Sequence, residues 1–220
     1  TDCHCHILPS LDDGATCLAE SVLLARYQVK WGFRKAVCTS HRVRQYPNEP
    51  DQVKRTGSEL QEELSRQEIP LDLTPSMEYR LIPETWPETL EKKWLLPWEG
   101  NHILIELPIH KASRIGNIVP EDEIKRLLDM GFQPVLAHPE RDLYLGMENR
   151  VVFNIMDVMT GVCRLNKAIL RVHGFQSLYF MAASPRRGDV RLTAESMIAL
   201  CEILERYFDH IIIDTGAGIH

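Results

Sequence analysis

Short apolar stretches alternate along this chain with longer segments whose apolar residues recur at helical spacing. Strands that alternate with helices are typical of βαβ units, which form a mainly parallel sheet. This alternation constrains the fold more than any other feature of the sequence. Strands are expected at residues 2–8, 35–39, 71–79, 102–107, 133–138, 177–183 and 210–214. Helices are expected at residues 17–31, 50–67, 83–93, 121–130, within 147–170 and at 193–208.

Seven strands of this kind indicate an open sheet or a barrel. The 220 residues are enough to bury a core without disulfide bonds, and no repeat or flexible linker divides them. We therefore expect one α/β domain over residues 1–220. The helix at 193–208 begins at Thr193, a good N-cap residue, although Ser196 stands where a capping box has Glu or Gln.

Composition excludes several classes of partner and location. The net charge of −6 argues against a role in coating nucleic acid, because phosphate backbones are repelled by such a surface. No apolar run reaches the roughly 20 residues that span a bilayer, so no membrane insertion is expected. The six cysteines are scattered rather than spaced as a disulfide framework, which predicts a reducing, cytoplasmic compartment.

The first expected strand carries the clearest chemical signal. Its residues Asp2-Cys3-His4-Cys5-His6 place His4 and His6 on one face, because successive side chains of a strand point to opposite faces. Two imidazoles one residue apart can bind the same metal ion. The competing interpretation, in which Cys3 and Cys5 are the ligands, is weaker because no second CxC or CxxC completes a thiolate site.

Four later strands also end in residues that can bind metal. The carboxyl ends of parallel strands meet at one edge of a sheet or barrel, where sites are usually built. A carboxylate inside an apolar strand is costly unless it is paired or bound to metal. The residues that share this position are His4, His6, His41, Glu78, Glu106 and His138.

This set of imidazoles and carboxylates predicts a metal centre with Mn, Zn, Fe or Mg. Six ligands are too many for one tetrahedral ion, so two or three ions are expected. Such clusters activate water and balance charge in phosphoryl transfer. Arg141 follows His138 by three residues and is suited to bind phosphate oxygens, with Arg42 as a second candidate.

The same residues resemble a known family. The segments HCHILP at 4–9 with DDGA at 12–15, TSHR at 39–42, IEL at 105–107 and AHPER at 137–141 occur in order over roughly residues 1–145. They are similar to the polymerase-and-histidinol-phosphatase family, in its branch of bacterial tyrosine phosphatases of capsule and exopolysaccharide synthesis. The resemblance implies a distorted, TIM-like barrel of seven parallel strands and three metal ions. Of the possible metals, we expect Mn before Zn, Fe or Mg.

The resemblance also implies a reaction. Phosphotyrosine would be hydrolysed by a metal-bound hydroxide, with the tyrosine-rich tail of a bacterial kinase of polysaccharide assembly as substrate. The implied metal ligands are His4, His6, His41, Glu78, Glu106, His138 and Asp214, and the implied phosphate contact is Arg141. Homo-oligomer formation is a further expectation.

The C-terminal third departs from the family pattern. Family members end the last strand with Ser-Asp-x-His, whereas here Asp214 is followed by Thr215 and Gly216. His220 is the next histidine. We therefore expect either a truncated chain or a weakened third metal position.

Three other functions remain open from the sequence. Cys38 and Arg44 have the Cys-x5-Arg spacing of thiolate phosphatases, although the segment between them has no glycine. An amidohydrolase-like metal enzyme shares the HxH opening, but no lysine is placed to bridge metals. A degenerate module would bind metal or a phosphotyrosine tail without turnover, since function depends on the site rather than the fold.

Overall fold

The computed structural model describes residues 1–107, 116–138, 152–171, 179–182, 193–209, 211 and 213. Its main sheet has five parallel strands in the spatial order β1-β2-β4-β5-β6. The strands are β1 (Asp2–Cys5), β2 (Lys35–Val43), β4 (Asp72–Arg80), β5 (His102–Glu106) and β6 (Gln133–Ala137). The short β3 (Tyr46–Pro47) pairs with the end of β2 in the antiparallel direction.

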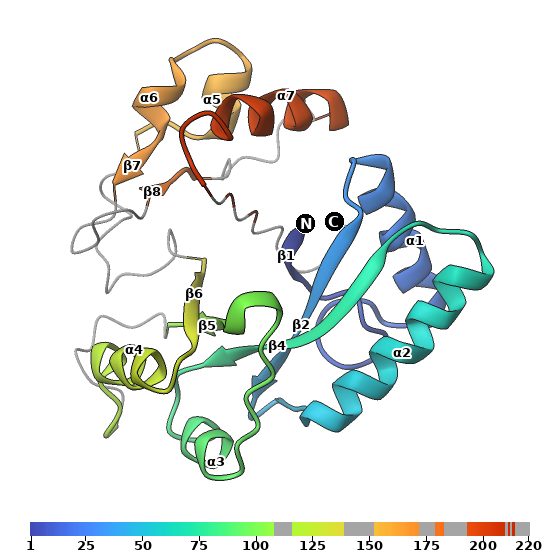
Figure 1. The fold of residues 1–220 in the computed structure, drawn as a ribbon, viewed down its shortest axis with the longest axis vertical. Helices are drawn as coiled ribbons and strands as arrows, with labels where there is room; N and C mark the ends of the chain where they lie inside the picture. The colour runs from blue at the N-terminus through green and yellow to red at the C-terminus, as the bar shows by residue number, and fades with distance from the viewer. Residues whose placement is uncertain are drawn as a thin grey trace.

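This sheet is curled, and the helices that connect its strands lie on its outer side (Figure 1). They are α1 (Leu18–Lys30), α2 (Pro50–Arg66), α3 (Trp86–Glu91) and α4 (Pro120–Asp129), with the 3-10 turn η1 (Glu99–Asn101) before β5. The expected βαβ architecture is therefore confirmed as a half-barrel. The described strands do not close it into the expected barrel of seven, since β1 and β6 remain at its edges.

Several element boundaries differ from the expected ones for physical reasons. β2 continues to Val43 rather than ending at Thr39, because its last residues pair with β4 on one side and with β3 on the other. β1 ends at Cys5 because the chain then turns back, with the Ala15 amide donating to the His6 carbonyl. α3 begins only at Trp86, three residues later than expected.

The core lies between the outer face of the sheet and its helices. Leu60 and Leu64 of α2 are fully buried, as are Ile103 and Ile105 of β5. α2 approaches β4 so closely at Gly57 that a side chain there would collide with Pro75. Burial of this helix face orients β4, and with it the polar residues at its carboxyl end.

The described residues beyond 152 form a separate group of elements. They are α5 (Ile155–Met159), α6 (Leu165–Ala168), β7 (Leu170–Arg171), β8 (Tyr179–Phe180) and α7 (Ala194–Leu204). In Figure 1 this group lies apart from the main sheet, and β7 and β8 form their own antiparallel sheet. The expected parallel strand at 177–183 is thus corrected to one side of a hairpin, and the helix expected within 147–170 is two short helices. Most of the strand expected at 210–214 lies outside the described residues.

The N-terminus of α7 has a capping box that was not expected from the sequence. Its N-cap is Thr193 as expected, and the Ser196 hydroxyl accepts a hydrogen bond from the Thr193 amide at 3.0 Å. The Ser196 amide in turn donates to the Thr193 hydroxyl at 3.2 Å. A capping box therefore forms with a serine in the position of Glu or Gln.

Along the described stretches of the chain, no helix has both the length and the apolar character needed to cross a membrane.

Candidate metal centre

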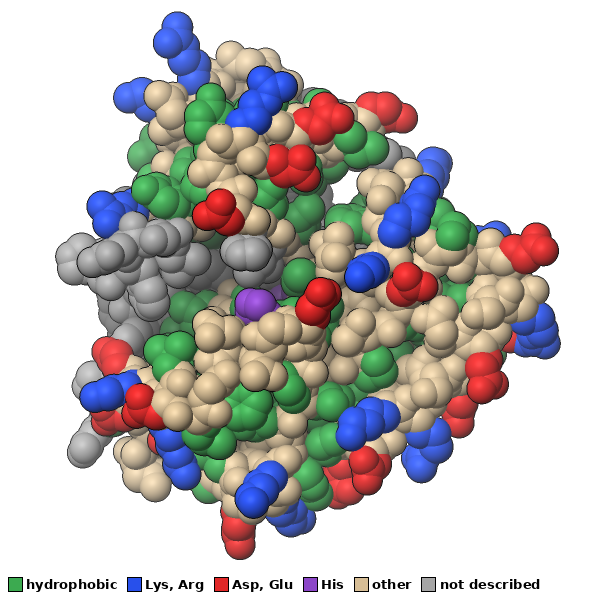
Figure 2. All heavy atoms as spheres, viewed as in Figure 1, with side chains coloured by type: hydrophobic (Ala, Val, Ile, Leu, Met, Phe, Trp, Pro, Cys, Tyr) green, Lys and Arg blue, Asp and Glu red, His purple; other side chains and the backbone are tan. Residues whose placement is uncertain are grey.

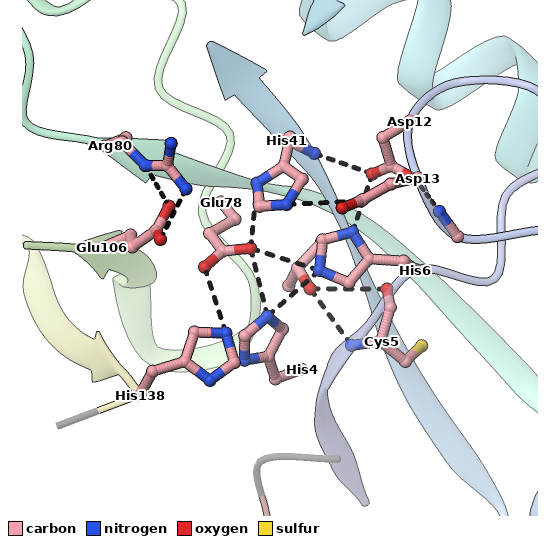
Figure 3. A network of polar contacts seen from close by, with 12 residues as sticks. His4, Cys5, His6, Asp12, Asp13, His41, Glu78, Arg80, Glu106 and His138 are labelled. Atoms are coloured by element: carbon pink, nitrogen blue, oxygen red, sulfur yellow. Dashed lines mark hydrogen bonds and ion pairs between the residues drawn. The ribbon is translucent and has the colours of Figure 1, made fainter. Parts of the chain in front are cut away.

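The ends of β1 and β2 bring three imidazoles to one buried carboxylate of β4, at the carboxyl edge of the half-barrel (Figure 3). Glu78 of β4 is fully buried. Its Oε2 lies 3.1 Å from His4 Nε2, 3.1 Å from His6 Nε2 and 3.2 Å from His41 Nδ1. The two nitrogens of His4 and His6 are themselves 3.1 Å apart, so the two side chains do project to one side as expected. Cys5 points the other way and donates to the Val37 carbonyl.

A fourth histidine approaches the other oxygen of this carboxylate. His138, directly after β6, has its Nε2 3.8 Å from Glu78 Oε1, too far for a hydrogen bond. Glu78 Oε1 is buried and accepts no hydrogen bond within the described structure. His138 also has a φ of 45°, and backbone strain of this kind is concentrated at functional sites.

These donors fit a divalent cation. A buried carboxylate oxygen without a hydrogen bond is costly, and neutral imidazole nitrogens together with carboxylate oxygens are good ligands for Mn, Zn or Fe. Three triads have ligand atoms within 4.8 Å of one another, and they share members. They are His4, His6 and Glu78; His6, Asp13 and His41; and His41, Glu78 and Glu106.

Asp12 holds two of the histidines in place from the loop after β1. Its Oδ2 is 2.7 Å from His6 Nδ1 and accepts the His41 amide at 2.8 Å, while Oδ1 accepts the Gly14 amide at 3.0 Å. Burial by itself lowers the pKa of His6 and raises the pKa of Asp12. The hydrogen bond between Asp12 and His6 nevertheless holds the pKa of Asp12 low. Together with Glu78, Asp12 raises the pKa of His6 to about 9. This arrangement directs His6 Nε2 toward Glu78.

Glu106 is held by an arginine in addition to facing the centre. Arg80 Nε and Nη2 donate to its two carboxylate oxygens, each at 2.6 Å. Figure 3 shows this pair beside Glu78 and His138.

In space-filling view a histidine side chain is visible at the middle of one face of the molecule (Figure 2).

Arg42 has a different environment from the one expected. It follows His41 in a strand, so its side chain lies on the opposite face of β2. It donates to the Asn48 carbonyl at 2.8 Å and to Glu88 at 2.7 Å, and its guanidinium lies 4.6 Å from the ring centre of Trp94. This side chain supports the fold rather than the centre.

The geometry also disfavours the thiolate alternative. The Cys38 side chain is fully buried, and residues 38–43 are extended in β2 rather than wrapped into a phosphate-binding loop. The expected phosphate contact Arg141 and the expected ligand Asp214 lie outside the described residues.

Sequence reasoning assigned no role to three residues of this site. Asp12 and Asp13 were part of the recognised DDGA segment, and their place six and seven residues after His6 was the available signal. Asp13 Oδ1 lies 3.4 Å from His41 Nε2, on the exposed side of the centre. Arg80 could have been found from the strand period, because it is two residues from Glu78.

Gly14 makes the loop after β1 possible. A Cβ at this position would lie 2.0 Å from the His6 carbonyl oxygen and 2.4 Å from the His6 Cβ. We expect Gly14→Ala to destabilise the protein by about 1–3 kcal/mol or more, because the loop must move away from His6. Thermal unfolding measures this loss, with Gly131→Ala as control because open space surrounds that position. Since Gly131 has a φ of 86°, some backbone strain is expected in the control. A Gly14 variant no less stable than the control would contradict the expectation.

Comparison with known proteins agrees with this geometry. The profile of the family described as capsular polysaccharide synthesis, CpsB/CapC, matches residues 1–183. The tyrosine-protein phosphatase YwqE of Bacillus subtilis is 32% identical over 157 residues, which are 71% of this chain and 60% of YwqE. A solved chain is 35% identical with a TM-score of 0.58, over 67% of this chain and 58% of that chain. It belongs to the crystal structures of YwqE and of Streptococcus pneumoniae CpsB, described as unique metal-dependent tyrosine phosphatases.

A second group of relatives consists of septum site-determining proteins rather than phosphatases. A putative septum site-determining protein MinD of Oltmannsiellopsis viridis is 40% identical over 96 residues, 41% of this chain and 30% of that protein. The MinD of Synechocystis is 38% identical over 78 residues, 36% of this chain and 29% of that protein. The chain thus spans less than two thirds of the length of YwqE and about a third of these MinD proteins.

Proposed function

Because the chain belongs to the CpsB/CapC family of capsular polysaccharide synthesis, we propose that it is a metal-dependent phosphatase acting on phosphotyrosine in proteins. The observation that carries this proposal is the position of Glu78, whose carboxylate faces four histidines in a buried site. The substrate that we propose is the tail of a bacterial tyrosine kinase of capsule assembly. The six thiols, all free, favour the cytoplasm as its place of action.

The proposed centre holds two or three ions, with Mn the preferred metal and Zn, Fe or Mg as alternatives. The ligands we propose are His4, His6, Asp13, His41, Glu78, Glu106 and His138. Divalent ions bound there lower the pKa of water and balance the charge of phosphoryl oxygens. Closure of the half-barrel to seven strands, the contact of Arg141 with phosphate and homo-oligomer formation stay predictions.

The side chains have distinct tasks in this reaction. Glu78 supplies negative charge at the point where the three strand ends meet, so it can face more than one cation. Asp12 keeps His6 and the end of β2 in position. Asp13 is half-exposed and lies 3.4 Å from His41, so it gives the centre a carboxylate that solvent can reach.

Metal content and hydrolysis of a phosphotyrosine peptide test the proposal together. Protein purified without chelator should contain two or three equivalents of Mn, Zn or Fe by plasma mass spectrometry. Turnover should stop with EDTA and survive iodoacetamide, because the proposed ligands are imidazoles and carboxylates and none is a thiol. A chain that stays free of metal in excess Mn and Zn would contradict the proposal. A metal-loaded chain that binds the peptide without turnover would favour a binding module.

Metal uptake should depend on pH through His6. Its pKa of about 9 means that this imidazole is protonated at neutral pH in the ion-free protein. An ion must displace that proton, so apparent Mn affinity is expected to rise by up to about tenfold per pH unit and to level off above pH 9. Calorimetric Mn titrations in buffers of different ionisation enthalpy measure both the affinity and the released proton. An affinity independent of pH between about 6 and 9 would exclude this coupling.

We also propose that the C-terminal part of the chain is the portion related to MinD. The family profile matches residues 1–183 and so leaves residues 184–220 outside it. The Synechocystis MinD match covers 36% of the chain. The separate β7–β8 sheet supports this division.

Exposed apolar side chains give a second reason. In the described C-terminal elements, the large hydrophobic side chains that remain exposed are Val152, Val162, Tyr179, Ile198, Ile203 and Tyr207. The expected single domain over 1–220 stays untested, and this division is the alternative we favour.

The division predicts different effects for two expected ligands. His138→Ala should remove at least one equivalent of Mn and the EDTA-sensitive activity, because His138 faces Glu78. Asp214→Asn should leave both unchanged if the C-terminal part contributes no ligand. Metal content and peptide hydrolysis of the two full-length variants provide the comparison. Loss of an ion in Asp214→Asn would instead place Asp214 in the centre, as the family pattern implies.

A further inference from the structure

Arg80 occupies a position at the centre that the proposed ligand set leaves unexplained. It is the last residue of β4 and follows Glu78 by two residues, so both side chains project from the same face of the strand. Its Cα is paired directly with that of Glu106 in the β4–β5 ladder. The register of these strands therefore places a cation beside two acidic side chains of the candidate site.

The contact between Arg80 and Glu106 competes with metal binding. Both oxygens of Glu106 accept hydrogen bonds from the guanidinium at 2.6 Å. The same carboxylate belongs to the triad with His41 and Glu78, whose ligand atoms lie close enough for one ion. If His41, Glu78 and Glu106 held a divalent ion, the charge of Glu106 would be shared with that ion, and the guanidinium of Arg80 would be repelled by it.

Of the two partners, Arg80 is the one that can move. Its side chain is 33% exposed, whereas that of Glu106 is 9% exposed and that of Glu78 is fully buried. Arginine also has a long, flexible stem that reaches solvent from a strand end. Glu106 has little exposed surface, so on binding of an ion the guanidinium of Arg80 would be the group that moves.

We propose that Arg80 holds Glu106 in the ion-free protein and contacts the phosphoryl group of the substrate once Glu106 binds a divalent ion. This inference rests on the proposed phosphatase function. The planar fork that now binds a carboxylate has the same geometry for two phosphate oxygens. Arg42 cannot take this role, because its guanidinium is bound on the other face of β2.

The test measures Mn binding and inorganic phosphate binding separately in the full chain. Arg80→Gln is expected to bind Mn more tightly than the unchanged protein, because a competitor for Glu106 is gone. Its Mn-loaded form should bind inorganic phosphate at least about tenfold more weakly, the loss expected for a charge-assisted hydrogen bond. Arg80→Lys, which keeps the charge without the fork, should recover part of the phosphate affinity. Arg55→Gln on the exposed face of α2 is the matched control.

The outcomes separate this inference from the proposed function. Weaker Mn binding with unchanged phosphate affinity in both Arg80 variants would show that Arg80 only positions Glu106, and would overturn the inference. No phosphate binding by the Mn-loaded, unchanged protein would overturn it as well. If that protein binds phosphate through Arg80 but does not hydrolyse phosphotyrosine, the inference holds and the proposed activity fails. Arg80→Lys keeps the test valid if Arg80→Gln does not fold.

Discussion

Replacing Glu78 with glutamine is expected to remove at least one divalent ion per chain and to lower phosphotyrosine hydrolysis by at least about a hundredfold. Glu78 is the one side chain in the described structure that faces His4, His6, His41 and His138 together. Glutamine has nearly the same shape, so the variant tests the charge rather than the packing. It also places an amide donor against imidazole nitrogens that must be free to bind metal.

The same substitution has a second measurable effect. The carboxylate of Glu78 helps to raise the pKa of His6 to about 9, against the opposing effect of burial. Without the charge of Glu78, we expect the pKa of His6 to fall. NMR titration of the ion-free protein can detect the change. Glu59→Gln, an exposed change on α2, is the control for metal content and turnover. Unchanged metal content and turnover in Glu78→Gln would refute the proposed centre.

Replacing Asp12 with asparagine is expected to weaken Mn binding by about 10- to 100-fold, although Asp12 is not in the proposed ligand set. Its carboxylate accepts hydrogen bonds from His6 Nδ1 and from the amides of His41 and Gly14. Asparagine has one acceptor oxygen instead of two, and its amide group meets donors. His6 and the end of β2 then lose the contacts that aim them at Glu78.

Asp12→Asn should also destabilise the ion-free protein by about 1–3 kcal/mol, the cost of unsatisfied buried groups. The hydrogen bond with His6 lowers the pKa of Asp12 in the folded state, against the opposing effect of burial. Its contribution to stability is therefore present at neutral pH and is lost as pH falls through the folded-state pKa. The stability difference between the two proteins should shrink in acid.

Unfolding in urea at several pH values, together with Mn titration, checks both effects. Asp51→Asn is the matched control, because the Asp51 side chain is 96% exposed. Equal Mn affinity in Asp12→Asn and Asp51→Asn would show that Asp12 does not position the histidines. A stability difference that grows in acid would contradict the role of its ionised form.

The alternation of strands and helices and the HxH pattern were sufficient to predict the half of the fold that carries the site. Both depend on local backbone geometry: side chains alternate along a strand, and parallel strands expose their carboxyl ends at one edge. His4 and His6 therefore project together before any long-range contact is known. The apolar periodicity likewise located α2 to within one residue, from Pro50 to Arg66.

Other features depended on which strands are neighbours and on their register. β2 extends past Thr39 because β3 and β4 pair with it, and this extension puts His41 and Arg42 on opposite faces. The β4–β5 register pairs Arg80 with Glu106, and the loop after β1 folds back to bring Asp12 to His6. The sequence by itself determined the local period of each element and the kinds of residue at its end. Only the tertiary structure decided which of those residues meet, because contacts between distant segments depend on strand pairing and helix packing rather than on local spacing.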